Sequence, residues 1–267
     1  MNLALLGGGK MGEALARGLI AADWDRESIA IAEIDSDRRR VLEEQLPGVR
    51  VVPSAAWAAA DVDVIVIAVK PGDVAEALEV CTPTLPEEAL ILSIAAGVTL
   101  AELERAAGNR PVVRAMPNAG ALVGKGAAAI AGGTRAHEQH LELAERVLGA
   151  VGTVVRVPEV HLDAVTGLSG SGPAYVFLLA EAMTEAGVLV GLSRPVAAAL
   201  VRQTLLGAAT LLDETGESPE SLRAAVTSPG GTTAAGLQAL EAHGVRAAIL
   251  DAVEAATVRA RELGDHS

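Results

Sequence analysis

The sequence has 267 residues, which is enough for about two domains with hydrophobic cores of their own. Hydrophobic residues make up 51% of the chain and charged residues 21%, so a disordered polyelectrolyte is excluded. Aromatic residues, at 1%, leave few side chains to stack on bases, and a net charge of −13 repels phosphate backbones and anionic lipid. We therefore expect neither nucleic acid nor a membrane as a partner.

The cysteine content and the start of the sequence predict a cytoplasmic protein. The single cysteine, Cys81, permits no internal disulfide. Strand-like residues follow Met1 directly, without the basic and apolar segments of a secretory signal. Apolar runs such as 64–69 and 174–180 are shorter than the ~20 residues that cross a bilayer, so we expect them to be buried in protein.

Residues 1–160 alternate between short β-branched runs and alanine-rich stretches with helical periodicity. Strands are expected at 3–6, 29–32, 49–52, 64–69, 90–94, 112–114, 127–131 and 153–156. Helices are expected between them at 11–22, 35–45, 74–81, 100–107 and 136–148. Short strands that are apolar on both faces predict a parallel sheet covered by helices, which is a doubly wound, Rossmann-type α/β domain.

Residues 161–267 show no further strand pattern and predict an all-α C-terminal domain. Helices are expected at 173–192, 195–213, 219–227, 232–243 and 245–262. The first has only Glu181 and Glu185 as charged residues, and the second only Arg202 and Asp213, so neither has a polar face. We expect these helices to be buried in a homodimer or larger assembly. The alternative is that they pack only against the N-terminal domain.

A glycine-rich motif, Gly7-Gly8-Gly9-Lys10-Met11-Gly12, follows the first expected strand and opens the first expected helix. In this G-x-G-x-x-G pattern Gly7 permits a tight turn, Gly9 lets the backbone approach a pyrophosphate, and Gly12 allows close helix packing. Glu33 follows Gly12 by 33 − 12 = 21 positions, at the end of the second strand, where a ribose hydroxyl would be bound. The motif predicts a dinucleotide site; the alternative is a glycine-rich turn without a ligand.

The choice between NADH and NADPH stays open at this point. Glu33 favours a free 2′-hydroxyl and therefore NADH, because its carboxylate repels a 2′-phosphate. Arg38, Arg39 and Arg40 would instead attract that phosphate, unless they form only the solvated first turn of the next helix.

Three other segments do not match the functional motifs that they resemble. The segment 120–126 has one residue too few between its glycines for a phosphate loop and lacks the Ser or Thr that binds Mg²⁺. The segment 167–171 ends in Ser171 instead of the final glycine of a nucleophile elbow. His137 and His140 are not four residues apart, as the histidines of a zinc helix are, so no metal site is expected.

Four further segments have the form of site loops: 68–71, 93–97, 114–118 and 228–233. The first three end expected strands on the carboxyl side, where doubly wound folds bind their ligands, although short βα connections would look the same. The fourth, Ser228-Pro229-Gly230-Gly231-Thr232-Thr233, precedes a helix whose first N–H groups would suit a carboxylate. An ordinary turn with a threonine cap is the alternative there.

Together these motifs resemble those of the pyrroline-5-carboxylate reductase family, in order along nearly the whole chain. The resemblance rests on the glycine motif, Ala68-Val69-Lys70-Pro71, Arg114-Ala115-Met116-Pro117-Asn118, Leu168-Ser169-Gly170-Ser171-Gly172-Pro173-Ala174-Tyr175 and Ser228–Thr233. It implies an oxidoreductase of proline biosynthesis that reduces 1-pyrroline-5-carboxylate to L-proline by hydride transfer from NADPH or NADH. It also implies a Rossmann domain, residues 1–160, and a helical substrate-binding and dimerisation domain, residues 161–267, in an interlocked homodimer that in this family often forms a decamer of five dimers.

The resemblance also implies roles for individual residues. Cofactor binding is expected from Leu6, Gly7, Gly8, Gly9, Lys10 and Met11, from Ala68, Val69, Lys70 and Pro71, and from Ile94, Ala95 and Ala96. The glycine motif and its spacing add Gly12 and Glu33 to the expected cofactor residues. Substrate binding is expected from Ser169, Gly170 and Ser171 and from Gly231, Thr232 and Thr233. The family pattern is not matched everywhere, since Ala55 stands where some members have an asparagine and Glu33 where many have a small polar residue.

The expected chemistry needs positioning more than covalent help. A protonated cyclic imine is already electrophilic, so hydride transfer requires mainly that the reacting atoms be held about 3–3.5 Å apart. Thr233 or Ser171, or a bound water, would handle the proton on nitrogen, in a cleft between the two domains. Two other classes remain: a β-hydroxyacid-type dehydrogenase, which would use a lysine of the helical domain where this chain has none, and a non-catalytic dinucleotide sensor.

Overall fold

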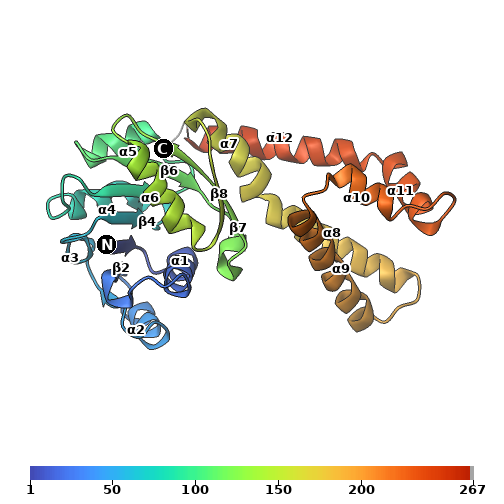
Figure 1. Cartoon of the computed structure of the whole chain (residues 1–267), viewed down its shortest axis with the longest axis horizontal. Helices are drawn as coiled ribbons and strands as arrows, with labels where there is room; N and C mark the ends of the chain where they lie inside the picture. The colour runs from blue at the N-terminus through green and yellow to red at the C-terminus, as the bar shows by residue number, and fades with distance from the viewer. Residues whose placement is uncertain (265–267) are drawn as a thin grey trace. The chain divides into compact units, whose positions relative to one another are not determined.

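The computed structural model describes residues 1–264, and these form two compact units (Figure 1). The first unit contains Met1–Ser171 together with the end of the last helix from Glu254 onward, and the second contains Gly172–Val253.

The first unit is built on a sheet of eight strands within residues 1–264, in the order β3-β2-β1-β4-β5-β6-β7-β8. The strands are β1 (Leu3–Leu6), β2 (Ile29–Ala32), β3 (Arg50–Val52), β4 (Val64–Ile67), β5 (Leu90–Ser93), β6 (Val112–Met116), β7 (Gly126–Gly132) and β8 (Gly152–Arg156). The first six pair in parallel in the order of a dinucleotide-binding fold, which confirms the expected Rossmann-type architecture.

The sheet is not parallel throughout, because β7 runs antiparallel to β6. The chain between them contains only a short 3₁₀ segment, Ala119–Val123, and a parallel pair needs a crossover of about a dozen residues or more. The chain therefore turns back, and β8 then pairs in parallel with β7 through the helix α6 (Glu138–Gly149).

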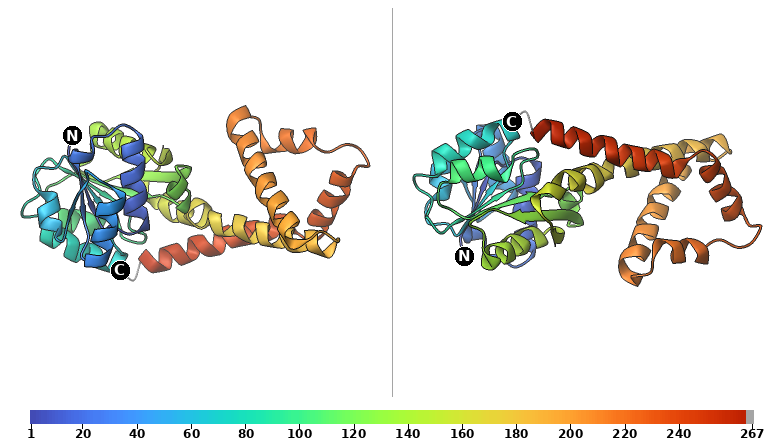
Figure 2. Two further views of the ribbon diagram at one scale, coloured as in Figure 1. Left: turned by 90° about the horizontal axis from the view of Figure 1, so that it is seen from below. Right: turned by 90° about the horizontal axis from the view of Figure 1, so that it is seen from above.

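Helices cover both faces of this sheet (Figure 2). Successive strand side chains point to opposite faces, so Leu3 and Leu5 lie in one core cluster and Ala4 and Leu6 in the other. The first cluster includes residues of α1 (Lys10–Ala21), α2 (Ser36–Gln45) and α6. The second includes residues of α3 (Ala55–Ala59), α4 (Val74–Cys81), α5 (Leu100–Ala107) and α7 (Leu162–Val165). The short α3, centred on Trp57, was not expected from the sequence.

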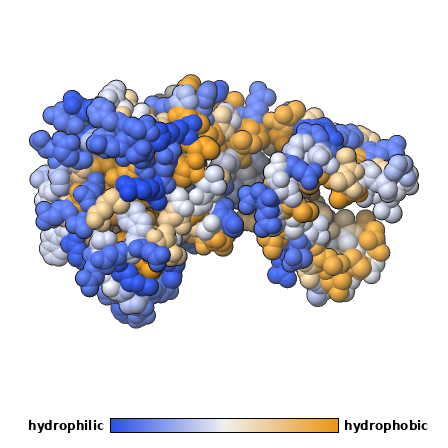
Figure 3. All heavy atoms as spheres, in the orientation of Figure 1, coloured by the Kyte–Doolittle hydropathy of each residue, from blue (hydrophilic) through white to orange (hydrophobic). Residues whose placement is uncertain are grey.

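The second unit is helical, as expected. Its helices are α8 (Gly172–Leu189), α9 (Arg194–Thr215), α10 (Pro219–Ala225), α11 (Thr232–Ala242) and the first part of α12 (Val245–Gly264). Large apolar side chains of these helices are exposed in the single chain, among them Phe177 at 69% and Leu250 at 70%. Figure 3 shows apolar surface over α8 and α9. This exposure is what the sequence predicts for helices that are buried only in an assembly.

The sequence predicts apolar runs that are too short to cross a bilayer, and one helix is longer than this prediction allows. Of the helices in residues 1–264, α9 alone has the length and hydropathy of a membrane span, with 22 residues and a mean hydropathy of 1.4 over an 18-residue stretch. Length and composition alone do not identify a membrane span, since core helices of soluble proteins meet the same criteria.

Candidate functional site

A groove of about 590 Å³ lies in the first unit at the carboxyl ends of β1, β2, β3 and β4. The strand order reverses between β1 and β4, and ligands of doubly wound folds bind at this point. Its lining residues are Leu6, Gly7, Gly9, Ala32, Glu33, Ile34, Asp35, Pro53, Ser54, Ala55, Ala68, Val69, Lys70, Asp73, Glu76, Ala77 and Val80. A larger cavity of about 1010 Å³ lies between α4 and α5, and Pro71 lines that cavity instead.

The glycine turn has the geometry that a dinucleotide needs. Gly7 has a φ of +105°, and a Cβ there would lie 2.6 Å from the carbonyl oxygen of Ala68, the residue after β4. A Cβ on Gly12 would lie 2.1 Å from the carbonyl oxygen of Gly7, so only glycine lets α1 begin this close to the turn. A Cβ on Gly9 would meet nothing within 4 Å. Two glycines thus shape the turn, and the third leaves room for a phosphate at the start of α1, where Gly9 provides no side-chain cap.

Glu33 joins the glycine turn to the end of β2. Its carboxylate accepts one hydrogen bond from the Gly8 N–H and one from the Asp35 N–H, each at 2.9 Å. These two donors fix the carboxylate on the groove wall, next to a second acidic residue, Asp35. The residue that the spacing singled out therefore lies beside the glycine motif.

The three arginines after β2 all donate to groups of the chain itself. Arg38 donates to the Gly8 carbonyl at 2.7 Å and pairs with Glu13 of α1, and this hydrogen bond holds the pKa of the Glu13 carboxyl below its usual value. Arg39 donates to the carbonyls of Glu33 and Ile34. Arg40 pairs with the exposed Asp37. Arg38 thereby links α2 to the glycine turn and to α1.

The sequence missed part of this groove. Besides Ala55, which the family pattern singles out, that part includes Pro53 and Ser54 after β3, the α4 N-cap Asp73, and Glu76 in the first turn of α4. Their place could not be predicted because it depends on β3 lying beside β2, and the order of strands in a sheet leaves no local pattern. Of the expected cofactor residues, Gly8, Lys10, Met11 and Gly12 belong to the turn and first helix without lining the groove. Ile94, Ala95 and Ala96 follow β5, outside it.

The segment Ser169–Ser171 lies at the junction of two helices. Residues Thr166–Gly170 form a π-helical turn between α7 and α8, in which the Ser171 N–H donates to the Thr166 carbonyl at 2.8 Å. Such turns are rare and occur often at functional sites. The side-chain amide of Asn118 donates to the Ser169 carbonyl at 3.0 Å.

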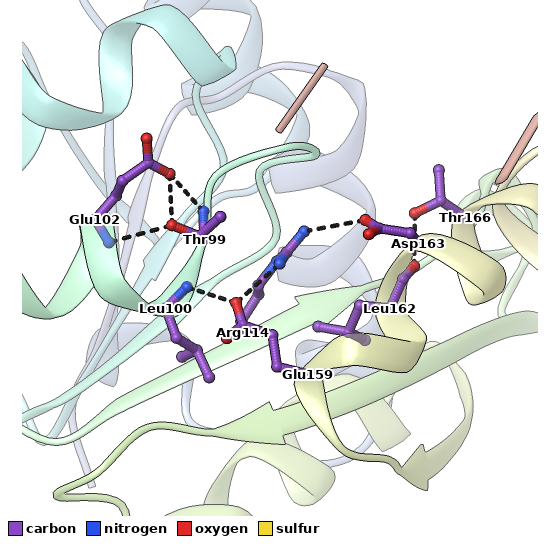
Figure 4. Close-up of polar contacts among 8 residues, drawn as sticks. All are labelled: Thr99, Leu100, Glu102, Arg114, Glu159, Leu162, Asp163 and Thr166. Carbon is purple, nitrogen blue, oxygen red and sulfur yellow. Dashed lines mark hydrogen bonds and ion pairs between the residues drawn. The ribbon is translucent and has the colours of Figure 1, made fainter. Parts of the chain in front are cut away.

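Arg114 of the same motif as Asn118 is buried, with 7% of its surface exposed. Its guanidinium lies 2.9 Å from Glu159 and 4.0 Å from Asp163 at the start of α7 (Figure 4). The same Glu159 oxygen accepts the Leu100 N–H at the start of α5. The side chain of Arg114 therefore links β6, α5 and α7, and does not line the groove at the ends of β1 to β4.

The Gly231–Thr233 turn belongs to the second unit. Gly230 has a φ of +68°, and Gly231 is the N-cap of α11, without a side-chain hydrogen bond to the helix. Thr232 and Thr233 are exposed in the first turn of α11. Ser171 and Thr233, the two expected catalytic residues, thus lie on different compact units.

The residues that the structure describes support neither a metal site nor a reactive cysteine. Residues 1–264 contain no cluster of three or more His, Cys, Asp or Glu side chains able to hold a metal ion. Cys81 is buried in the core, and burial raises the pKa of its thiol to about 11, so it stays protonated and unreactive.

Comparison with known proteins identifies the family. Residues 159–263 match the family model for pyrroline-5-carboxylate reductase dimerisation, and residues 2–97 match that for coenzyme F420-dependent NADP oxidoreductases. A pyrroline-5-carboxylate reductase of Synechocystis is 44% identical over 99% of this chain and 98% of its own. The chain belongs to the pyrroline-5-carboxylate reductase family.

Solved structures of the pyrroline-5-carboxylate reductase family share the fold along the whole chain. The enzyme of Coxiella burnetii has a TM-score of 0.94 and 37% identity, with 98% of both chains covered. That of Plasmodium falciparum, solved with NADP bound, has a TM-score of 0.85 and 30% identity, with 99% of this chain and 98% of that one covered. The family, fold and oligomerising helical region expected from the sequence are thereby confirmed.

Proposed function

We propose that this chain reduces 1-pyrroline-5-carboxylate to L-proline with NADPH or NADH, the final reduction of proline biosynthesis. The observation that carries the proposal is the glycine turn: Gly7 and Gly12 have no room for a Cβ, whereas Gly9 faces open space beside the groove. Pyrroline-5-carboxylate reductases match this chain over nearly its full length, which supports the substrate. A dehydrogenase acting through a lysine is disfavoured because Lys10, Lys70 and Lys125 are the only lysines, and none belongs to the helical unit.

The dinucleotide is held by the first unit. The backbone N–H groups at the start of α1 bind the pyrophosphate, Glu33 binds the adenosine ribose, and Ala68, Val69, Lys70 and Pro71 border the nicotinamide side with Ile94, Ala95 and Ala96. A bound nicotinamide supplies the hydride that reduces the C=N bond. The carboxylate of Glu33, and the engagement of Arg38, Arg39 and Arg40 with groups of the chain, favour a free 2′-hydroxyl over a 2′-phosphate.

The imine substrate is held by groups from two segments. The N–H groups and hydroxyls of Gly231, Thr232 and Thr233, at the start of α11, bind its carboxylate. Ser169, Gly170 and Ser171 border its ring, and Ser171 or Thr233 handles the proton on nitrogen. Because the imine is intrinsically electrophilic when protonated, orientation supplies most of the rate enhancement.

The exposed apolar helices indicate how the chain assembles. The apolar side chains of α8 and α9 are covered in a homodimer, which we propose assembles further as five dimers. Residues 1–160 form the dinucleotide-binding domain and residues 161–267 the substrate-binding and dimerisation domain. The net charge of −13 argues against nucleic acid and membrane partners, and we propose a cytoplasmic location.

The test is a direct assay of the purified protein. NADH or NADPH is mixed with pyrroline-5-carboxylate, and loss of nicotinamide absorbance is followed together with formation of L-proline. Proline formed in a 1:1 ratio to the dinucleotide consumed is the expected result. Dinucleotide binding without turnover would instead identify a sensor.

A further inference from the structure

We propose that Asn118 is a positioning residue: it holds the π-helical segment Thr166–Gly170 in place and so orients Ser169 and Ser171 toward the substrate. This inference rests on the proposed function, which places these serines at the imine. It concerns a residue that does not line the groove and whose side chain bonds to main-chain groups, one of them the Ser169 carbonyl.

The side chain of Asn118 connects two parts of the first unit. Its oxygen accepts the N–H groups of Gly120 at 3.0 Å and Ala127 at 3.1 Å, which fixes the amide within the turn between β6 and β7. Its nitrogen donates to the Ser169 carbonyl at 3.0 Å, 51 positions along the chain. The two acceptor bonds leave the NH₂ group only one orientation, so the donor is aimed at Ser169 before any ligand binds.

The sequence explains why Ser169 needs an external donor. In an α-helix its carbonyl would accept a hydrogen bond from the N–H of the residue four positions later. That residue is Pro173, which has no N–H. Ser169 is half-buried, and Asn118 gives its carbonyl a donor in place of the missing α-helical partner.

Two further contacts from the same strand hold the segment. A Cβ on Gly170 would lie 2.8 Å from the Cε of Met116, so the π turn packs closely on the end of β6. Arg114 pairs with Glu159 and Asp163, and Asp163 belongs to α7, which runs directly into the π turn. The chain just before the segment is thus held by an ion pair, Ser169 is held by Asn118, and Gly170 at the end of the segment packs on Met116.

Asn118→Asp is the most selective test. Aspartate has nearly the same shape and keeps an oxygen to accept the Gly120 and Ala127 N–H groups, but it cannot donate to Ser169. We expect the KM for pyrroline-5-carboxylate to rise about fivefold to tenfold, as loss of one hydrogen bond predicts, and the KM for NADH to change less than twofold. We also expect faster amide hydrogen exchange in residues 166–171, with the glycine turn unchanged.

Asn2→Asp is the matched control. It removes the same kind of bond, from an asparagine amide to a main-chain carbonyl, here that of Asp61 at 2.9 Å, on the exposed surface at the amino end of β1. Both KM values and the exchange of residues 166–171 should stay at those of the unmodified chain. A second test is Asn118→Asp combined with Pro173→Ala, which restores an N–H four residues after Ser169 and should recover part of the lost affinity.

The outcomes separate the two proposals. If the unmodified chain forms no proline, the proposed function fails, and hydrogen exchange alone then decides whether Asn118 holds the segment. If the chain is active but Asn118→Asp leaves exchange and the KM for pyrroline-5-carboxylate unchanged, the positioning role is wrong. An equal rise in both KM values would also contradict it, because that pattern indicates a general loss of structure.

Discussion

Arg114 and Glu159 form an ion pair across 45 positions of the chain, with 2.9 Å between a guanidinium nitrogen and a carboxylate oxygen. The two partners are not equally buried, since the side chain of Arg114 is 9% exposed and that of Glu159 is 35% exposed. The pair links β6 to the segment that leads into the π turn. Because the two side chains are unequally buried, we expect their removal to lower stability by different amounts.

Removing Glu159 should cost more stability than removing Arg114. Glu159→Ala leaves a buried guanidinium whose nearest other carboxylate, Asp163, is 4.0 Å away, and it also takes the acceptor from the Leu100 N–H. We expect the free energy of unfolding to fall by about 2–3 kcal/mol, somewhat below the range for fully buried pairs. Arg114→Met should cost about 1 kcal/mol, because the carboxylates it frees reach solvent. Urea denaturation measures both, and a larger loss for Arg114→Met would refute this account.

The two kinds of glycine in the turn should respond differently to substitution. Gly9→Ala adds a Cβ in open space, so the unfolding midpoint should change little while the Kd for NADH rises about tenfold. Gly12→Ala places a Cβ against the Gly7 carbonyl and should lower stability by about 1–3 kcal/mol as well as weaken binding. Gly149→Ala, at the end of α6 with nothing within 4 Å, is the control. Calorimetry of unfolding and of NADH binding compares the three; unchanged NADH affinity in Gly9→Ala would remove Gly9 from the site.

Glu33 should set the preference between the two dinucleotides. Glu33→Ser removes the carboxylate that repels a 2′-phosphate, so the ratio of kcat/KM for NADPH to that for NADH should rise, on the order of tenfold. Asp37→Ser removes an exposed carboxylate of α2 that pairs with Arg40, and it should leave the ratio nearly unchanged. Equal ratios in Glu33→Ser and the unmodified chain would discard this role.

Thr233 should matter for both binding and turnover. Loss of its hydroxyl removes a donor to the substrate carboxylate, so Thr233→Ala should raise the KM for pyrroline-5-carboxylate about tenfold and lower kcat. Thr210→Ala is a suitable control, because that hydroxyl only donates back to the Leu206 carbonyl within α9. Steady-state kinetics at saturating NADH distinguishes the variants. Kinetics like those of the unmodified chain would place Thr233 outside the site.

His140 should make stability depend on pH. It is 7% exposed, its Nδ1 accepts the His137 N–H, and burial lowers the pKa of its imidazole below 6.5, with the charge of His137 adding to the effect. In the window from pH 6.5 down to the folded pKa, the unfolded chain binds a proton that the folded chain does not. The free energy of unfolding therefore decreases as the pH is lowered through that window, by at most about 1.4 kcal/mol per pH unit.

The comparison variant for this effect is His140→Gln. Glutamine retains an acceptor for the His137 N–H but does not titrate, so the unfolding midpoint should depend less on pH between 7 and 5. A pH profile that is the same with and without His140 would show that other groups cause the acid sensitivity. Thermal unfolding at matched ionic strength provides the measurement.

The sequence by itself determined most of the helices and strands and the family, but not the short α3 or the π turn. Strands such as Leu3–Leu6 and helices such as Val74–Cys81 were predictable because side-chain periodicity is a local property, and the glycine turn because its conformations admit almost no other residue.

Only the tertiary structure decided which distant residues meet. That Asn118 would reach Ser169, that Arg114 would be buried against Glu159, and that Ser54 would line the dinucleotide groove depends on strand order and on the antiparallel return of β7. These contacts join positions tens of residues apart. Their energy comes from burial and hydrogen bonds that exist only once the sheet has formed, so no local pattern records them.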